Sequence, residues 1–243
     1  MCFLALEYKV VPDYPVVLAA NRDEYLDRPS LPVMELRPGV WGGKDAVAGG
    51  TWLGINRHGL IVGVANLRSS NPQDPDARSR GLLCLDLLER ADPAQCADAL
   101  KRYVQDAVYN DFNLLVASVT GAWIATWVKP DLRVNRLEPG IHILGNSRPN
   151  LLDDPKVSRG RAVIKSTDID ATLLNLQTAC RDHGARSDGS DAICIHAARH
   201  GTRSSAIIAL HYRDPRRHRY LAAEGRPCRS EYQDLSRQIH EKV

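Results

Sequence analysis

Residues 2–24 read CFLALEYKVVPDYPVVLAANRDE, and this stretch decides the fold. Two β-prone apolar runs flank VVPDYP, whose prolines and aspartate are typical of a turn. Two such runs around a short turn predict a β-hairpin. Because hairpin strands are antiparallel, the start of the first strand lies beside the end of the second. We therefore expect Cys2 to lie close to Asn21, Arg22 and Asp23.

Cys2 has two readings, a packed core residue or a reactive group. Free cysteine is among the most buried residue types, which favours packing. However, cytosolic aminopeptidases remove an initiator methionine before a small residue, which would leave Cys2 with a free α-amine. An α-amine has a pKa of about 7.7–8.0 and can act as the base for a thiol of pKa about 8.5. Arg22 is then expected to lower the thiol pKa, and Asp23 to orient the ammonium.

The rest of the chain continues with hairpins, then helices. AVAGGTWLGIN (46–56) and GLIVGVANLR (59–68) predict a second hairpin, with glycine at its turn. FNLLVASV (112–119) and AWIATWV (122–128) predict a third. Residues 79–91 and 93–105 have helical spacing, and Asp92 and Pro93 form a typical helix start.

The C-terminal third predicts further elements. Residues 156–183 are helical in pattern, with a helix that starts at Thr167 or Asp168 and runs to about Cys180. Three strands are expected at DAICIHA (191–197), SSAIIALHY (204–212) and HRYLAAE (218–224). SEYQDLSRQIHEK (230–242) predicts a closing helix capped by Ser230. Two antiparallel sheets covered by helices satisfy this order.

Composition narrows the class of protein. The 243 residues are 44% hydrophobic and 25% charged, with a net charge of +3, as expected for one globular domain over residues 1–243. No apolar run approaches the ~20 residues of a membrane span, and no signal peptide is recognisable, so we expect a cytoplasmic protein. Basic and acidic residues are interspersed, which argues against nucleic-acid binding; RDPRRHR (213–219) reads as a solvated turn.

Cysteine and histidine spacing predicts neither disulfides nor a metal. Six cysteines lie far apart without a CxxC pair and read as free thiols, with Cys84 and Cys194 inside apolar runs. The eight histidines show no HExxH motif. His196 and His200 are four residues apart, but in a strand-like run that spacing does not converge on one ion. We expect no metal and no other cofactor.

Several motifs together carry a family resemblance. They are CFLALEY, AANRDE, AGGTWLGIN with VANLR, GNSRPNLLDDPKVSRG and GTRSSAIIAL, in this order from residue 2 to about residue 212. This pattern resembles the NRDE-domain family, also called the transport and Golgi organisation 2 family. The resemblance implies an α+β fold of the N-terminal-nucleophile (Ntn) hydrolase type, a four-layer αββα sandwich of two antiparallel sheets.

A weaker resemblance reaches the choloylglycine hydrolase and penicillin V acylase group. That group shares an MC start, an RNxD motif, a GxNxxGL hairpin leading to an asparagine, and a later asparagine-bearing turn. The resemblance implies that Cys2 is the nucleophile, that Asn21 and Asp23 belong to the site, and that Asn66 and Asn146 stabilise the oxyanion.

One position departs from that pattern. Ala20 stands where the group has its arginine, and Arg22 occupies the variable position. In a regular strand the side chain of Arg22 points to the opposite face from Asn21 and Asp23, because strand neighbours alternate. A bulge at this point would change that direction.

The motifs and the resemblance leave two alternative functions of different classes. The first is an Ntn-type cysteine amidohydrolase or acyltransferase acting on a small amide or thioester. The second is a non-catalytic carrier on the same fold, for haem or an acyl-CoA-type lipid. Trp52, Arg203 and Ser204 are candidates for contacting a small-molecule substrate or hydrophobic ligand. Trp52 can equally fill core, and GTRSS (201–205) can equally be a polar strand start.

Overall fold

The predicted N-terminal hairpin is present in the computed structural model. Strands β1 (Phe3–Val11) and β2 (Tyr14–Tyr25) pair antiparallel, with Phe3 opposite Asn21. The structure describes residues 3–163, 167–186 and 189–240, so Cys2 lies outside the described residues.

The chain divides into two compact units. Unit 1 comprises the chain up to Arg28 and from Glu138 onward, and unit 2 comprises Pro29–Leu137. The hairpin β1–β2 belongs to unit 1, and each unit contains one antiparallel sheet. The predicted α+β class with two antiparallel sheets is therefore confirmed. A single domain over the whole chain stays a prediction.

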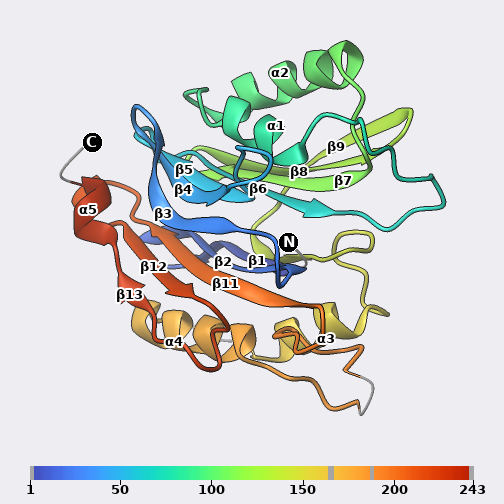
Figure 1. Ribbon diagram of the computed structural model, residues 1–243. Helices are drawn as coiled ribbons and strands as arrows, with labels where there is room; N and C mark the ends of the chain where they lie inside the picture. Colours follow the sequence, from blue (N-terminus) through green and yellow to red (C-terminus); the bar gives the residue numbers. More distant parts are fainter. Residues whose placement is uncertain (1–2, 164–166, 187–188, 241–243) are drawn as a thin grey trace. The chain divides into compact units, whose positions relative to one another are not determined.

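Unit 1 contains a six-stranded sheet of order β10-β1-β2-β11-β12-β13. Its further elements are β10 (Gly140–Leu144), α3 (Pro155–Val163), α4 (Ile169–Cys180), β11 (His200–Leu210), the 3-10 helix η1 (Pro215–Arg217), β12 (Arg219–Glu224), β13 (Gln233–Asp234) and α5 (Ser236–His240). Helices α3 and α4 cover one face of the sheet (Figure 1). Phe3, Val17 and Ile207 pack there against Val157 of α3 and Leu176 of α4.

Unit 2 contains a seven-stranded sheet in sequence order, β3-β4-β5-β6-β7-β8-β9. Its elements are β3 (Ser30–Arg37), β4 (Val40–Asp45), β5 (Leu53–Asn56), β6 (Ile61–Asn66), α1 (Arg80–Leu87), α2 (Pro93–Asp106), β7 (Phe112–Ser118), β8 (Gly121–Val128) and β9 (Asp131–Arg136). Helices α1 and α2 lie on one face of this sheet, where Leu83, Leu87 and Leu100 join its core.

Local signals at helix starts are confirmed. Asp92 caps α2 by accepting a hydrogen bond from the Gln95 amide at 2.9 Å, and Pro93 occupies the first turn. Asp168 caps α4 through the Ala171 amide, also at 2.9 Å. Both caps satisfy amides that have no partner within their own helix.

Two predictions near the C-terminus are wrong. Residues 191–197 form no strand, because the Ile193 and Cys194 amides donate to the carbonyl of Asp182 instead of to a neighbouring strand. Only His196 makes an isolated bridge, to Gly201. The closing segment is not one helix from Ser230, because its residues 233–234 pair with β12 as β13 before α5 begins at Ser236.

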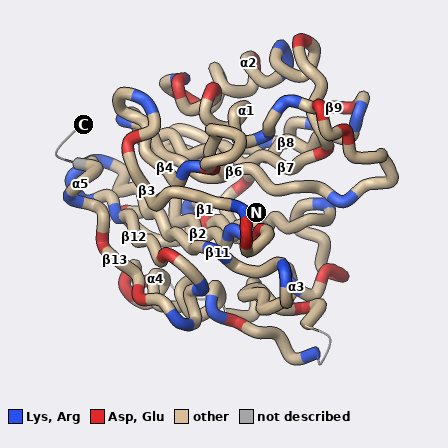
Figure 2. The backbone as a smooth tube through the Cα atoms, in the orientation of Figure 1, with Lys and Arg blue, Asp and Glu red and all other residues tan. Residues whose placement is uncertain are grey.

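Charge is spread along both units. Figure 2 shows Lys and Arg segments alternating with Asp and Glu segments along the backbone tube. RDPRRHR lies where expected, at the turn between β11 and β12, with Asp214 pairing with Arg216. Among the described residues, no helix has both the length and the apolar character that crossing a lipid bilayer requires.

Candidate functional site

The candidate site lies where four neighbouring strands of unit 1 begin or end at one edge of the sheet. Leu144, which ends β10, is opposite Leu4 of β1, and Phe3 is opposite Asn21 of β2. Asn21 is in turn opposite Ser205 of β11. Because all these pairs are antiparallel, the end of β10, the start of β1, the end of β2 and the start of β11 meet at this edge.

Asn21 is buried beneath this edge and connects two other segments to β2. Its side-chain Nδ2 donates to the carbonyl oxygens of Cys180 at 2.9 Å and of Ile193 at 3.1 Å. Val17 and Ala19 precede it on the face that packs against α4, so strand alternation brings Asn21 to the end of that helix. Asn21 therefore holds the C-terminus of α4 and the segment before β11 in place.

Asp23 is a buried carboxylate with one satisfied oxygen. Thr202 donates from Oγ1 to Asp23 Oδ1 at 2.6 Å, and the Ile195 amide donates to the same Oγ1 at 2.9 Å. Asp23 is 3% exposed, and its Oδ2 has no hydrogen-bond partner among the described residues. Buried polar oxygens are nearly always hydrogen-bonded in folded proteins, so this oxygen is positioned to receive a donor.

Arg22 lies between these two residues on a regular strand. The irregularity in pairing falls on β11, between Thr202 and Ser204, while β2 continues without a bulge. The side chain of Arg22 therefore leaves the opposite face from Asn21 and Asp23, as the sequence predicts for a regular strand. It is 3% exposed.

Asn146 follows β10 in a turn whose shape is set by Asn150. The Asn150 amide donates to the Ile143 carbonyl, and the Ile143 amide donates to Asn150 Oδ1, both at 2.8 Å. Asn150 has a φ of 59°, a left-handed conformation that asparagine tolerates better than most residues. This double link holds Asn146 at the same edge of the sheet as Phe3.

The GTRSS motif places four side chains at this edge, the two predicted ones and two more. Arg203 donates to the Leu26 carbonyl, which ties it to the segment that follows β2, and Ser204 is buried. Ser205 donates to the Ala20 carbonyl at 3.1 Å and shares a 2.7 Å hydrogen bond with the Tyr232 hydroxyl. Thr202 and Ser205 were not predicted, because only the pairing of β2 with β11 reveals their partners.

The remaining predicted residues belong to unit 2. Asn66 is the exposed last residue of β6, opposite Phe112 of β7. Trp52 is half-buried, and its ring lies so close to Gly43 that a Cβ there would be 2.4 Å from it. The Trp52 carbonyl also accepts from the Val64 amide at 2.9 Å. Trp52 is thus at least partly a packing residue.

Unit 1 also has a groove of about 610 Å³, at a different place. Its lining includes Tyr14, Ile169, Arg217 and Ser236. Tyr14 begins β2 whereas Asp23 lies near its end, so the groove is at the opposite end of the sheet from the candidate site.

A second group of reactive side chains lies beside Asn21. His183, Cys194, His196 and Cys228 place their ligand atoms within 4.8 Å of one another, although they come from distant parts of the sequence. Spacing did not reveal this group, because only Cys194 and His196 are near each other in the chain.

The family model of Transport and Golgi organisation 2 matches residues 1–218. The chain belongs to this family. The mouse Transport and Golgi organization 2 homolog is 27% identical over 86% of this chain and 88% of its own length. The human homolog is 28% identical with the same coverage. The uncharacterized protein YGR127W of Saccharomyces cerevisiae is 33% identical over 34% of this chain.

The fold of this chain is similar to that of solved Ntn hydrolases. Penicillin V acylase from Agrobacterium tumefaciens has a TM-score of 0.61 at 14% identity and covers 92% of this chain and 83% of its own. The Caenorhabditis elegans ortholog of N-acylethanolamine-hydrolyzing acid amidase has a TM-score of 0.58 at 13% identity, with 85% and 92% covered. At such identities the similarity establishes the fold, not the reaction.

Proposed function

We propose that this family member is an Ntn-type cysteine amidohydrolase or acyltransferase, with Cys2 as nucleophile after loss of Met1. The buried Asp23 oxygen that lacks a described partner carries the proposal. Cys2 is bonded to Phe3, which limits its Cα to about 3.8 Å from that of Phe3. Phe3 pairs with Asn21, so the first described residue of β1 lies opposite the end of β2, and the proposal places the Cys2 thiol near that end.

The structural neighbours support this chemistry. They include an acylase, an acid amidase and the conjugated bile acid hydrolase of Clostridium perfringens. One structure of the bile acid hydrolase is its C2A mutant, so that protein also has a cysteine at position 2.

The proposed reaction begins with proton transfer from the Cys2 thiol to its own α-amine. The thiolate attacks the substrate carbonyl, and a carbon–sulfur bond forms as the π electrons move to oxygen. The α-ammonium then gives its proton to the leaving amine or thiol, and an acyl-enzyme thioester remains. Water, or an acceptor nucleophile in acyl transfer, releases the acyl group and restores the thiol.

Charged neighbours of Cys2 have separate roles in this proposal. Asp23 accepts a hydrogen bond from the α-ammonium through Oδ2 and orients it, while Thr202 fixes the carboxylate through Oδ1. Arg22 leaves the opposite face of β2 and stabilises the thiolate, taking the role of the arginine that Ala20 replaces.

Asparagine side chains are proposed to hold the oxyanion. Asn146, at the same sheet edge as Phe3, donates one hydrogen bond, and Asn66 of unit 2 donates the second. A single donor to an oxyanion typically lowers the activation barrier by about 2.7–4 kcal/mol. Arg203 and Ser204 are proposed to contact the substrate from β11, and Trp52 from unit 2.

Mass spectrometry and thiol labelling test the nucleophile. Intact mass should show loss of Met1, and an acyl-type electrophile should modify Cys2 much faster than Cys96. Burial raises the pKa of Cys96 to about 12, so this thiol is a matched unreactive control. Retention of Met1 in active protein would contradict the α-amine as base.

Turnover is tested with penicillin V, N-acylethanolamines, a conjugated bile acid and an acyl-CoA thioester. For a substrate that is cleaved, Cys2→Ala should lower kcat/KM by roughly 1,000-fold or more, whereas Cys96→Ala should change it little. Tight, stoichiometric binding of haem or acyl-CoA with no turnover and equal labelling of all thiols would instead favour the carrier function.

A further inference from the structure

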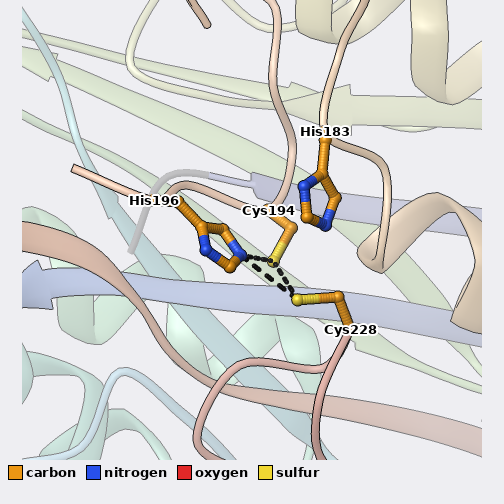
Figure 3. Close-up of side chains that lie close together, drawn as sticks. All are labelled: His183, Cys194, His196 and Cys228. Carbon is orange, nitrogen blue, oxygen red and sulfur yellow. Dashed lines mark hydrogen bonds between the residues drawn. The ribbon is translucent and has the colours of Figure 1, made fainter.

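Four side chains of the kinds that bind metals converge in unit 1 from three separate segments. His183 follows α4, Cys194 and His196 precede β11, and Cys228 follows β12. Figure 3 shows the four side chains directed toward one another. All four ligand atoms lie within 4.8 Å of each other, which is a distance set that one ion can bridge.

The three separations among Cys194, His196 and Cys228 are close to the edges of a tetrahedron around zinc. With Zn–S bonds of about 2.3 Å and Zn–N bonds of about 2.0–2.1 Å, tetrahedral geometry requires about 3.8 Å between sulfurs and about 3.5 Å between sulfur and nitrogen. The sulfurs of Cys194 and Cys228 are 3.7 Å apart. His196 Nε2 lies 3.6 Å from the first sulfur and 3.2 Å from the second.

His183 is the fourth member of the group. Its ring centroid is 4.7 Å from that of His196, with the two planes inclined by 33°. Two neutral imidazoles this close can both be ligands of one ion.

Hydrogen bonds connect the three segments that carry the four side chains. The carbonyl of Asp182, next to His183, accepts from the Cys194 amide at 2.7 Å. Arg181 donates from Nε to the Pro227 carbonyl at 3.0 Å, which fixes the segment of Cys228. These hydrogen bonds bring the ligand-bearing segments together, which lowers the entropic cost of binding an ion.

We propose that His183, Cys194, His196 and Cys228 form a four-coordinate zinc site. Each cysteine binds as thiolate and releases one proton to solvent, so the two thiolates balance the charge of Zn²⁺. Because all four positions are filled by protein, the site is structural and not catalytic. The sulfur and imidazole donors favour zinc over magnesium or calcium, which prefer oxygen.

The zinc site braces the candidate active site. Ile193 and Ile195 flank Cys194, and their backbone groups bind Asn21 and Thr202 respectively. Zinc therefore fixes the segment that supports Asn21 directly and Asp23 through Thr202. This inference does not depend on Cys2 acting as a nucleophile.

Metal analysis of the full chain, purified with a phosphine reductant and without chelator, tests the site. We expect one zinc per chain, and Co²⁺ added to the chelator-treated protein should give the intense visible bands of tetrahedral cobalt with thiolate charge transfer. Cys228→Ser and His183→Ala should each weaken zinc binding by roughly 100-fold or more, since even supporting residues around such sites contribute 10–100-fold.

Two controls separate this site from other ligands. His58→Ala removes an exposed histidine from unit 2, and Cys2→Ala removes the proposed nucleophile; both should retain one zinc. Substoichiometric zinc with an octahedral cobalt spectrum in the wild-type protein would overturn the proposal. So would a Cys194–Cys228 disulfide found by mass in protein kept under reductant. Loss of zinc in Cys2→Ala would also overturn the proposal, because it would show that zinc binds at another site, one that includes Cys2.

Discussion

The hydroxyl of Thr202 couples β11 to the carboxylate at the end of β2, which makes it a sensitive point at the residue scale. It donates to Asp23 and accepts from the Ile195 amide, and Thr202 is 1% exposed. Thr202→Val keeps the side-chain shape but leaves a buried amide and a carboxylate oxygen unsatisfied. We expect a loss of about 2–4 kcal/mol in the free energy of unfolding, measured with urea.

Thr202→Ser is the matched control for this prediction. It keeps the hydroxyl and removes one methyl group, so stability should fall by only about 1 kcal/mol. If the serine and valine variants were equally destabilised, the methyl group and not the hydrogen bonds would be the important part of Thr202.

Glu7 is a second buried carboxylate, placed on β1 at 1% exposure with neither oxygen hydrogen-bonded among the described residues. Burial raises its pKa from 4.5 to about 7. Below pH 4.5 both folded and unfolded states hold the proton, so Glu7 costs nothing there. Between pH 4.5 and 7 only the folded state holds it, and stability falls as pH rises, by about 3 kcal/mol in total.

Glu7→Gln removes this titration. Urea unfolding at pH 4.5 and pH 8 should show that wild-type stability falls by about 3 kcal/mol more than that of the glutamine variant between the two pH values. Parallel pH profiles for the two proteins would show that folding does not raise the pKa of Glu7.

Single residues were predictable where a local motif or a family motif marked them. Asn21 and Asp23 were identified from AANRDE, and the register of β2 has no bulge at Arg22, which is the condition for the alternation rule. The partners of these residues were not predictable. Thr202 is 179 positions from Asp23, and Cys228 is 34 from Cys194, so only the folded chain brings them together.

At the scale of elements, AGGTWLG contains a close approach between two backbone segments that the sequence alone does not predict. The Thr51 amide donates to the Gly81 carbonyl at the start of α1 at 3.0 Å. A Cβ on Gly50 would lie 2.2 Å from the Gly81 carbonyl carbon. Gly50→Ala should therefore push the start of α1 from the segment before β5 and destabilise unit 2 by about 1–3 kcal/mol.

Gly49→Asn is the control for Gly50→Ala. Gly49 has a φ of +76° with no atom within 4 Å of an added Cβ, and asparagine tolerates the left-handed region. We expect less than about 1 kcal/mol of destabilisation in urea unfolding. A larger loss in the asparagine variant than in Gly50→Ala would mean that backbone conformation, and not the close approach, governs this segment.

Elements with strong local signals were predicted well, and those set by tertiary contacts were not. Helix α2 has its aspartate cap and proline in sequence, and the three predicted hairpins have short turns. DAICIHA has a strand-like composition, yet its amides bind Asp182. Ala192, Ile193 and Cys194 of this segment are buried without strand pairing, which propensity cannot distinguish from a strand.

At the scale of the whole molecule, the order of strands depends on contacts between distant segments. Strand β2 pairs with β11, although the whole of unit 2 (Pro29–Leu137) lies between these two strands in the sequence. Periodicity predicts that strands exist, but not which strands become neighbours across such a separation. The Ntn-type fold could therefore be predicted only through the family motifs, whereas the α+β class follows from the pattern of elements.

Strand order also predicts which strands exchange their amide hydrogens slowly. In the unit 1 sheet, β2 and β11 are paired on both sides, whereas β3 of unit 2 is paired on one side only and has mostly exposed or half-buried residues. Amides in central strands exchange only when much of a unit opens, while those at an edge exchange through local fraying. Hydrogen exchange with mass readout should show β2 and β11 exchanging roughly 100-fold or more slowly than β3. Strand β7, which is central in unit 2, provides the control, because its protection shows that unit 2 is folded. Rapid exchange in β2 together with protection in β7 would contradict the prediction for unit 1.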